Sequence, residues 1–170
     1  MNMPVIHPHM QAVLEHSAAL MPAYSISETP LPLVRKKYAQ ERTYWNSGGP
    51  NISTILETKV KGASASIPIR IYHPNPENRL PLLVYLHGGG FVVGSNDSHD
   101  RIMRELAGRS GCAVLGIEYS LSPEYKFPVA LDEILLVLKW LKDDAHKLKE
   151  PAFNINPERI VLGGDSAGAS

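Results

Sequence analysis

The sequence predicts an α/β protein with a mostly parallel sheet and flanking helices, and three observations support this. Apolar runs of strand length lie at 82–86, 113–119 and 160–163. Helix candidates at about 98–109 and 129–148 separate them. Apolar strands that alternate with helices are typical of parallel βαβ units, in which helices cover both faces of the sheet. In sheets of this kind, ligands bind at the carboxyl ends of the strands.

The first 50 residues are predicted to form a separate helical segment. Residues 9–21 and 33–46 have the composition of two short amphipathic helices. The Pro-rich link "SETPLP" separates these helices, and a Gly-Gly-Pro turn at 48–50 follows the second one. We therefore expect a helical segment over 1–50 and an α/β domain over 51–170.

Two further strands are predicted before the first apolar run, at 52–60 and 65–73. In the second of them, isoleucine occupies every other position from 67 to 71, which is the period of a half-buried strand. Pro68 has no N–H group to donate to a ladder of hydrogen bonds. We therefore expect this strand to lie near an edge of the sheet.

The helix candidate at 129–148 has the clearest periodicity. It follows Pro128, and its apolar side chains recur at helical spacing as Ala130, Leu131, Ile134, Leu135, Val137, Leu138 and Leu141. In the helix at 98–109, we expect Ser98 to cap the first turn, with His99 and Asp100 opening the helix.

Composition and charge exclude several classes of function. The chain has 170 residues, 44% of them hydrophobic, which is enough for one core. Seventeen basic residues balance seventeen acidic ones, so neither a nucleic acid nor an anionic membrane is expected as a partner. The single cysteine, Cys112, cannot form an internal disulfide, which fits a reducing compartment, and we expect it to be a buried core thiol. No signal peptide or run of ~18 apolar residues is apparent, so we expect a cytoplasmic location.

The motif with the most specific chemistry follows the last apolar strand. Residues 164–168 read Gly-Asp-Ser-Ala-Gly, the G-x-S-x-G pattern of a nucleophile elbow, in which a serine lies on a tight turn between a strand and a helix. Glycine is expected at Gly164 and Gly168 because such a turn brings chain segments too close for side chains. Ser166 is therefore the candidate nucleophile, and Asp165 is interpreted as part of the turn.

A second glycine run, "HGGGF", ends an earlier apolar strand. Consecutive glycines weaken any helix or strand that contains them, so this stretch indicates a need for bare backbone. An acyl-transfer serine generates an oxyanion that must be met by preformed N–H donors. We predict that the amides of Gly88 and Gly89 form this oxyanion hole with that of Ala167, the residue after the nucleophile.

The same glycines do not fit a nucleotide site. Gly89 and Gly94 have the spacing of a phosphate-binding loop, but Ser95 and Asn96 stand where Lys and Ser or Thr would follow. Val93 occupies the position of the third glycine in a dinucleotide-binding fingerprint. No nucleotide cofactor is therefore expected.

Three blocks of the chain resemble the hormone-sensitive-lipase-like carboxylesterases of the α/β-hydrolase superfamily, most closely the bacterial acetyl esterases. They are "HGGGFVVGSNDSHD" at 87–100, "EYSLSPEYKFPVALDE" at 118–133 and "GDSAGAS" at 164–170. The resemblance covers residues 80–170 and implies an α/β-hydrolase fold, with the N-terminal helices as a cap over the acyl pocket. It also implies hydrolysis of short-chain, acetyl-type esters through a serine acyl-enzyme.

The resemblance implies roles for single residues as well. Ser166 would be the nucleophile, and Gly88, Gly89 and Ala167 would supply the oxyanion donors. His87 would shape the glycine loop without being the triad histidine. The remaining motif residues, which would support the loop and the elbow, are Gly90, Gly164, Asp165 and Gly168.

Other candidate residues are interpreted as structural. His7 and His9 have a spacing found in metal sites but lack a third ligand, so no metal is expected. Glu118 and Glu124 could be taken for paired catalytic carboxylates, but the resemblance implies that their block supports the strand and loop behind the site.

Two hypotheses for the function follow. Triad residues in α/β-hydrolases are ordered Ser, then Asp or Glu, then His, and four residues follow Ser166. We therefore expect the C-terminal strands, the triad acid and the triad histidine to be missing, and the chain alone to be inactive because a serine without a base is a poor nucleophile. The alternative is a noncatalytic remnant that binds a partner chain through its incomplete sheet. Because the last strand would be left as an apolar edge, we also expect the isolated chain to self-associate.

Overall fold

A computed structural model describes residues 6–20, 28–62, 66–145 and 148–170. The chain divides into two units, Met1–Trp45 and Asn46–Ser170. The first unit contains helices α1 (Pro8–Leu20) and α2 (Leu31–Trp45), within two residues of their predicted positions. The second unit contains the sheet and all the motifs described above.

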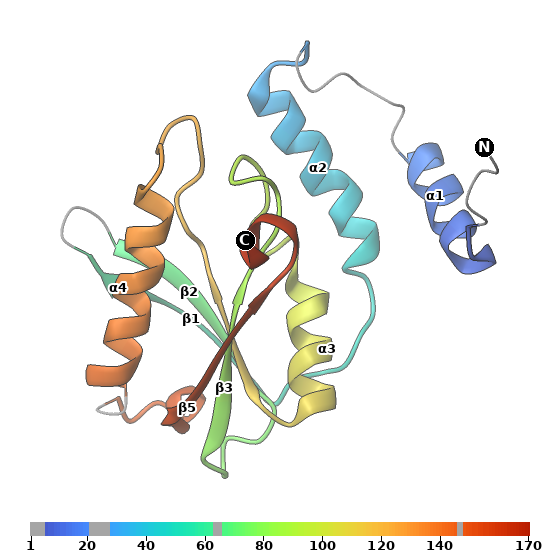
Figure 1. Cartoon of the computed structure of the whole chain (residues 1–170). Coiled ribbons are helices and arrows are strands. Elements are labelled where there is room, and N and C mark those ends of the chain that lie inside the picture. The colour runs from blue at the N-terminus through green and yellow to red at the C-terminus, as the bar shows by residue number, and fades with distance from the viewer. Residues whose placement is uncertain (1–5, 21–27, 63–65, 146–147) are drawn as a thin grey trace. The chain divides into compact units, whose positions relative to one another are not determined.

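The second unit is built on one five-stranded sheet in the order β1-β2-β4-β3-β5 (Figure 1). The parallel pairs are β3 with β4 and β3 with β5, whereas β1–β2 and β2–β4 are antiparallel. The sheet is therefore mixed in the part of the chain that the structure describes, and not mostly parallel as predicted. The strands are β1 (Thr54–Lys61), β2 (Ser66–His73), β3 (Leu80–Leu86), β4 (Ala113–Ile117) and β5 (Ile155–Gly164).

Strand β2 contains the alternating isoleucines and the proline that the sequence singles out. Its isoleucines at 67, 69 and 71 are buried, as their alternation predicts. β2 lies near an edge, as predicted, because only β1 is outside it in the sheet. Pro68 is accommodated because the β2–β4 ladder covers only Ile69 to Tyr72, so Pro68 lies just beyond it.

Two helices cover opposite faces of the sheet (Figure 1). Helix α3 (Asp100–Ser110) buries Met103 and Ala107 against one face. Helix α4 (Val129–Asp143) packs against the other face, where it buries Ile134, Val137 and Leu141. Its predicted periodicity is confirmed, but the helix ends at Asp143 and not at residue 148, because the apolar pattern stops at Leu141.

Strand β5 begins five residues before its predicted start. Its first residue, Ile155, pairs with Leu80, and regular pairing resumes between Ile160 and Leu82 after a shift in register. The intervening residues are mostly polar, so only the last part of the strand has an apolar pattern. A short 3₁₀ helix, η2 (Pro151–Phe153), precedes β5.

Two local predictions are wrong. Ser98 does not cap α3: its hydroxyl donates to the Ser95 carbonyl oxygen at 2.9 Å, and His99 occupies the N-cap position without a side-chain cap bond. Cys112 is half-buried and not buried, because it lies in the turn before β4 begins. No helix among the described residues is long and apolar enough to span a membrane.

Candidate active site

The two motifs predicted to act together lie at the same end of two neighbouring strands. β3 and β5 are parallel, and their last paired residues are Leu86 and Gly164. The glycine loop at 87–94 therefore leaves the sheet beside the turn that begins at Asp165. This arrangement brings together residues nearly 80 positions apart in the sequence.

Ser166 occupies a strained turn directly after β5. Its φ angle is +49°, in the left-handed region that side-chain-bearing residues rarely adopt. The turn is closely packed, since a Cβ atom at Gly168 would lie 2.0 Å from the Leu86 carbonyl oxygen. The Ser166 side chain is exposed, and within the described ranges its Oγ has no hydrogen-bond partner. A strained, accessible serine at a strand end is the geometry of a nucleophile elbow.

Asp165 connects the elbow to the glycine loop. Its Oδ1 oxygen accepts the Tyr85 hydroxyl at 2.7 Å and the Gly88 N–H at 2.9 Å. The Nε2 atom of His99 lies 3.4 Å from the same oxygen. Burial raises the pKa of the Asp165 carboxyl, but these three donors outweigh burial and leave the pKa below its usual value. The carboxylate is therefore held ionised and oriented.

The contact with Asp165 explains why residue 88 is glycine. A Cβ atom at Gly88 would lie 2.2 Å from the Asp165 Oδ2 atom, so no larger residue fits without displacing the carboxylate. The same contact uses the Gly88 N–H, which the glycine motif predicts to be an oxyanion donor. That donor is engaged within the protein and does not point to an open site.

Three other amides remain as candidates for binding an oxyanion. The N–H groups of Gly89, Gly90 and Ala167 have no hydrogen-bond partner among the described residues. The loop that carries the first two is closed by hydrogen bonds from the Val92 and Val93 amides to the Gly89 carbonyl oxygen, both 3.0 Å long. The Gly89 and Gly90 donors therefore belong to a fixed turn.

His87 has a structural place beneath this loop. Its Nδ1 atom lies 2.9 Å from the Gly88 carbonyl oxygen, so Nδ1 carries the proton. The ring stacks on Tyr119, with 4.3 Å between the ring centroids. Burial lowers the pKa of His87 to about 4, so the imidazole is neutral near pH 7. No hydrogen bond joins His87 to Ser166 in the described part of the chain.

Two residues of this arrangement, Tyr85 and His99, were missed as site residues by sequence reasoning. Tyr85 appears in the sequence as one member of an apolar strand, and His99 as the start of a helix. Their roles depend on contacts with Asp165, which lies 80 and 66 positions away. The only sequence signal is that both residues flank the glycine loop.

Two carboxylates of the 118–133 block accept hydrogen bonds from the backbone of neighbouring loops. Glu118 accepts the Asn96 N–H at 2.7 Å, and Glu133 accepts the N–H and hydroxyl of Ser120, both at 2.7 Å. Burial raises the pKa of Glu118.

Within the described residues no three His, Cys, Asp or Glu side chains are placed to hold a metal ion. His7 instead accepts the N–H of His9 on its Nδ1 atom at 3.2 Å.

The fold and the elbow together indicate a hydrolase of the α/β class, and comparison with known proteins agrees. A model of the α/β-hydrolase fold family matches residues 83–170, just over half of the chain. The chain belongs to this α/β-hydrolase family, which confirms the resemblance to carboxylesterases seen in the sequence.

Its relatives include acetyl esterases of Salmonella. The chain is 41% identical over 135 residues to the acetyl esterase of Salmonella schwarzengrund, covering 79% of this chain and 40% of that protein. It is 37% identical over 160 residues to the acetyl esterase of Salmonella agona, covering 94% and 47%. The chain thus spans about half the length of the relatives it matches.

Solved esterase structures share the fold over nearly the whole chain. The hyperthermophilic esterase from the archaeon Pyrobaculum calidifontis superposes with a TM-score of 0.84 at 32% identity, covering 98% of this chain and 51% of that one. An esterase from Rhizomucor miehei gives 0.83 at 31% identity, covering 97% and 51%. These comparisons support ester hydrolysis as the activity of the family to which the chain belongs.

Proposed function

We propose that the chain carries the nucleophile and the oxyanion site of a serine carboxylesterase that acts on short-chain, acetyl-type esters. The observation that carries the proposal is the left-handed φ of Ser166 at the end of β5, beside a glycine loop with unused N–H groups. The acetyl esterases among its relatives support the choice of substrate class.

In this mechanism, the Ser166 Oγ attacks the ester carbonyl carbon while a base accepts its proton. The carbonyl oxygen becomes an oxyanion, which we assign to the N–H groups of Gly89 and Ala167, with Gly90 beside them. Gly88 is left out of this group because its N–H is donated to Asp165. The tetrahedral intermediate expels the alcohol, which takes the proton from the base. Water then hydrolyses the acyl-serine and releases the acid.

The base is the part of this mechanism that the described residues do not supply. His87 and His99 are both engaged elsewhere, the first with Gly88 and the second with Asp165. We therefore propose that the 170-residue chain alone is inactive and that the triad acid and histidine belong to a longer chain. The role of residues 1–50 as a cap and the cytoplasmic location stay predictions.

The test compares Ser166→Ala with Ser170→Ala in the longest natural chain that carries this sequence. The intact protein is expected to hydrolyse p-nitrophenyl acetate faster than the octanoate. Ser166→Ala should lower turnover about 10³-fold or more, since a triad without its serine retains only the contribution of the oxyanion hole. Ser170→Ala removes a neighbouring hydroxyl and should have little effect. Retained turnover in Ser166→Ala would overturn the assignment.

A second experiment tests the 170-residue chain by itself. A fluorophosphonate probe reacts with activated serines, so the chain alone should be labelled little above the background given by Ser166→Ala. Stoichiometric labelling at Ser166 would show that a base within these residues activates the serine, and the proposed inactivity would be wrong.

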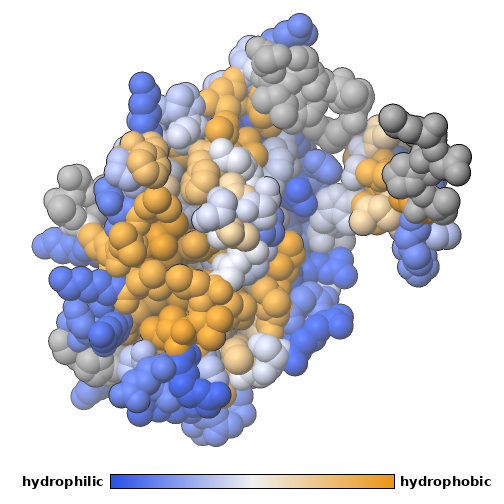
Figure 2. All heavy atoms as spheres, viewed as in Figure 1, coloured by the Kyte–Doolittle hydropathy of each residue, from blue (hydrophilic) through white to orange (hydrophobic). Residues whose placement is uncertain are grey.

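One observation favours the alternative function, which is binding of a partner chain through the sheet. Among the described strands, β5 pairs only with β3, so one of its sides is an open edge. Val161 and Leu162 are 62% and 54% exposed on this strand, and Leu131 and Leu135 are exposed on the neighbouring α4. Figure 2 shows the resulting apolar surface over α4 and β5. Open apolar edges pair with other chains.

A further inference from the structure

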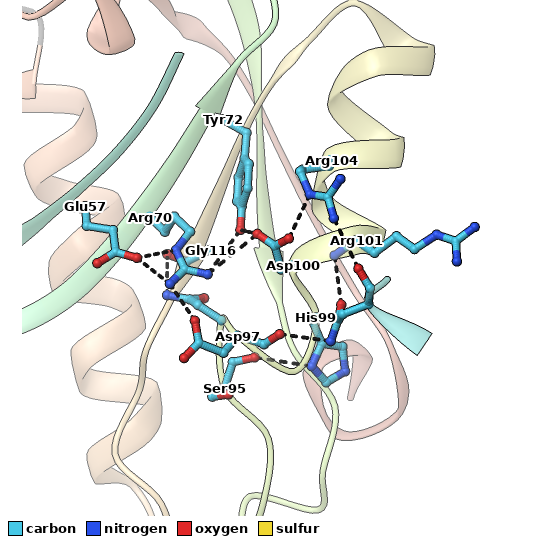
Figure 3. Close-up of polar contacts among 12 residues, drawn as sticks. Glu57, Arg70, Tyr72, Ser95, Asp97, His99, Asp100, Arg101, Arg104 and Gly116 are labelled. Atoms are coloured by element: carbon cyan, nitrogen blue, oxygen red, sulfur yellow. Dashed lines mark hydrogen bonds and ion pairs between the residues drawn. The ribbon is translucent and has the colours of Figure 1, made fainter. Parts of the chain in front are cut away.

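The turn between the glycine loop and α3 carries polar contacts that the reaction proposed above does not use (Figure 3). Arg70 of β2 reaches the Asp97 carboxylate at 2.6 Å and also faces Asp100. Asp100 accepts the Tyr72 hydroxyl at 2.7 Å and pairs with Arg104 at 2.7 Å. Burial by itself lowers the pKa of Arg70, but its bonds to Tyr72 and Asp97 raise the pKa above the usual value. The turn is thus anchored to β2 and α3.

The backbone of the same turn is fixed from a second side. Asn46 donates from Nδ2 to the carbonyl oxygens of Asp97 at 2.9 Å and Ser98 at 3.0 Å. Within the turn, the Ser95 N–H donates to the Ser98 hydroxyl at 2.8 Å, and the Ser98 N–H donates to the Ser95 hydroxyl at 3.1 Å. The reciprocal bonds between Ser95 and Ser98, together with those from Asn46, fix the backbone conformation just before His99.

His99 extends from this turn with a buried ring that is 1% exposed. Its Nδ1 atom lies 2.8 Å from the Ser98 hydroxyl, which donates its own proton to the Ser95 carbonyl oxygen. The Nδ1 atom must therefore be a donor. The Nε2 atom faces Asp165 Oδ1 at 3.4 Å. Only the imidazolium form donates from both ring nitrogens, and this form would pair with the Asp165 carboxylate.

We propose that His99 is a positioning residue of the esterase site, which acts through Asp165 to hold the Gly88 amide and, with it, the glycine loop against the Ser166 elbow. This inference rests on the function proposed above. The contacts that place His99 are those of its Nε2 atom with Asp165 and of its Nδ1 atom with the Ser98 hydroxyl. Its role is to fix the carboxylate together with Tyr85, which donates to the same oxygen.

The physical reason is that the loop must be placed accurately. Oxyanion donors act at 2.7 to 3.1 Å from the reacting oxygen, and a displacement of about 1 Å can cost about 100-fold in rate. The Asp165 carboxylate is partly exposed and could rotate if only one donor held it. A rotated carboxylate would release the Gly88 N–H, and the amides of Gly89 and Gly90 would move with it.

The experiment compares His99→Leu, which removes both donors, with His99→Gln, which keeps an amide N–H for Asp165. In the longest natural chain, His99→Leu should lower kcat for p-nitrophenyl acetate about 10- to 100-fold while KM changes less than about twofold. His99→Gln should recover most of the loss. Ile117→Val, in the core of β4, is the matched control for a modest loss of stability, and its kcat should stay near that of the unmodified protein.

A second readout does not depend on activity. The Gly88 amide hydrogen should exchange with solvent about tenfold faster in His99→Leu, because its acceptor is no longer fixed, and at nearly the unmodified rate in His99→Gln. Unchanged exchange and kcat in His99→Leu, or equal damage in both variants, would overturn the proposal. If Ser166→Ala retained turnover, the proposed serine esterase function would be wrong. The exchange rate of the Gly88 amide would still show whether His99 positions Asp165 and the glycine loop.

Discussion

The Gly88 amide donates a hydrogen bond to the Asp165 carboxylate at 2.9 Å, across 77 positions of the sequence. This bond joins the glycine loop after β3 to the turn after β5. It also gives the first glycine of "HGGGF" a different task from the one expected from the motif. Gly88 connects the two loops, and the amides of Gly89 and Gly90 have no hydrogen-bond partner among the described residues.

Replacement of Gly88 by alanine should damage the site more than the fold. The added Cβ would lie 2.2 Å from Asp165 Oδ2, so the carboxylate and the loop must separate. We expect turnover of p-nitrophenyl acetate to fall about 100-fold, as for a displacement near 1 Å. Gly111→Ala is the control, because Gly111 also has a positive φ but lies in open space at the end of α3. Equal turnover in the two variants would contradict this reading.

His87 should make the stability of the protein depend on pH. Burial lowers its pKa to about 4, whereas the unfolded chain titrates near the usual 6.5. The unfolded state therefore binds more protons between these values, so stability is complete above pH 6.5 and falls by about 3 kcal/mol as pH decreases to 4. Urea unfolding at several pH values measures this slope.

A matched pair of variants isolates the contribution of His87. His87→Asn keeps a side-chain N–H for the Gly88 carbonyl oxygen and has no ionisable ring, so the slope between pH 4 and 6.5 should become smaller. Asn51→Ala, at an exposed position without an ionisable side chain, should leave the slope unchanged. The assignment is wrong if both variants retain the full slope.

Two leucines of helix α4 should differ sharply in their contribution to stability. Leu141 is fully buried, whereas Leu135 is 62% exposed. Leu141→Ala should lower the free energy of unfolding by about 2 to 5 kcal/mol because it leaves a cavity in the core. Leu135→Ala should change it by less than about 0.5 kcal/mol in the isolated monomer. Denaturant midpoints measure both, and similar losses would contradict the packing described for this helix.

The open side of β5 should cause self-association of the 170-residue chain. Light scattering after size exclusion is expected to show dimers or larger species, and Val161→Lys combined with Leu162→Lys should shift them toward the monomer, because lysine protects strand edges. Ile55→Lys changes an exposed apolar residue on β1, at the other edge, and should not have this effect. If the 170-residue chain without substitutions is a monodisperse monomer, the open edge of β5 does not cause self-association.

The local pattern of the sequence was sufficient to predict which strands and long helices form, although the start of β5 and the end of α4 each differ by five residues. Apolar runs and helical spacing predicted every described strand and both long helices of the second unit, because these patterns record which faces are buried. G-x-S-x-G predicted the turn at Ser166, since the geometry depends on residues within the motif itself. The sheet order was not predictable in this way, because β4 lies between β2 and β3 through long-range pairing.

The contacts around Asp165 show what a linear pattern cannot contain. The Tyr85 hydroxyl and the His99 ring reach this carboxylate through the packing of β3, β5 and the turn before α3. The error at Ser98 has a similar cause, because a hydroxyl before a helix can bond either to the helix or to its own turn. Here the turn takes the hydroxyl, and this choice leaves His99 directed toward Asp165.

The register between β3 and β5 has a consequence for how the length of this chain can vary. Each residue of a strand advances the chain by about 3.3 Å, so one inserted residue near Leu86 or Gly164 would carry Gly88 out of reach of Asp165. The amino ends of the same strands already absorb a register shift between Leu80 and Leu82, and the turn before β3 is largely exposed. Insertions and deletions should therefore be tolerated at the amino ends of β3 and β5. At the carboxyl ends of these strands they should abolish activity, independently of which residues are inserted or removed.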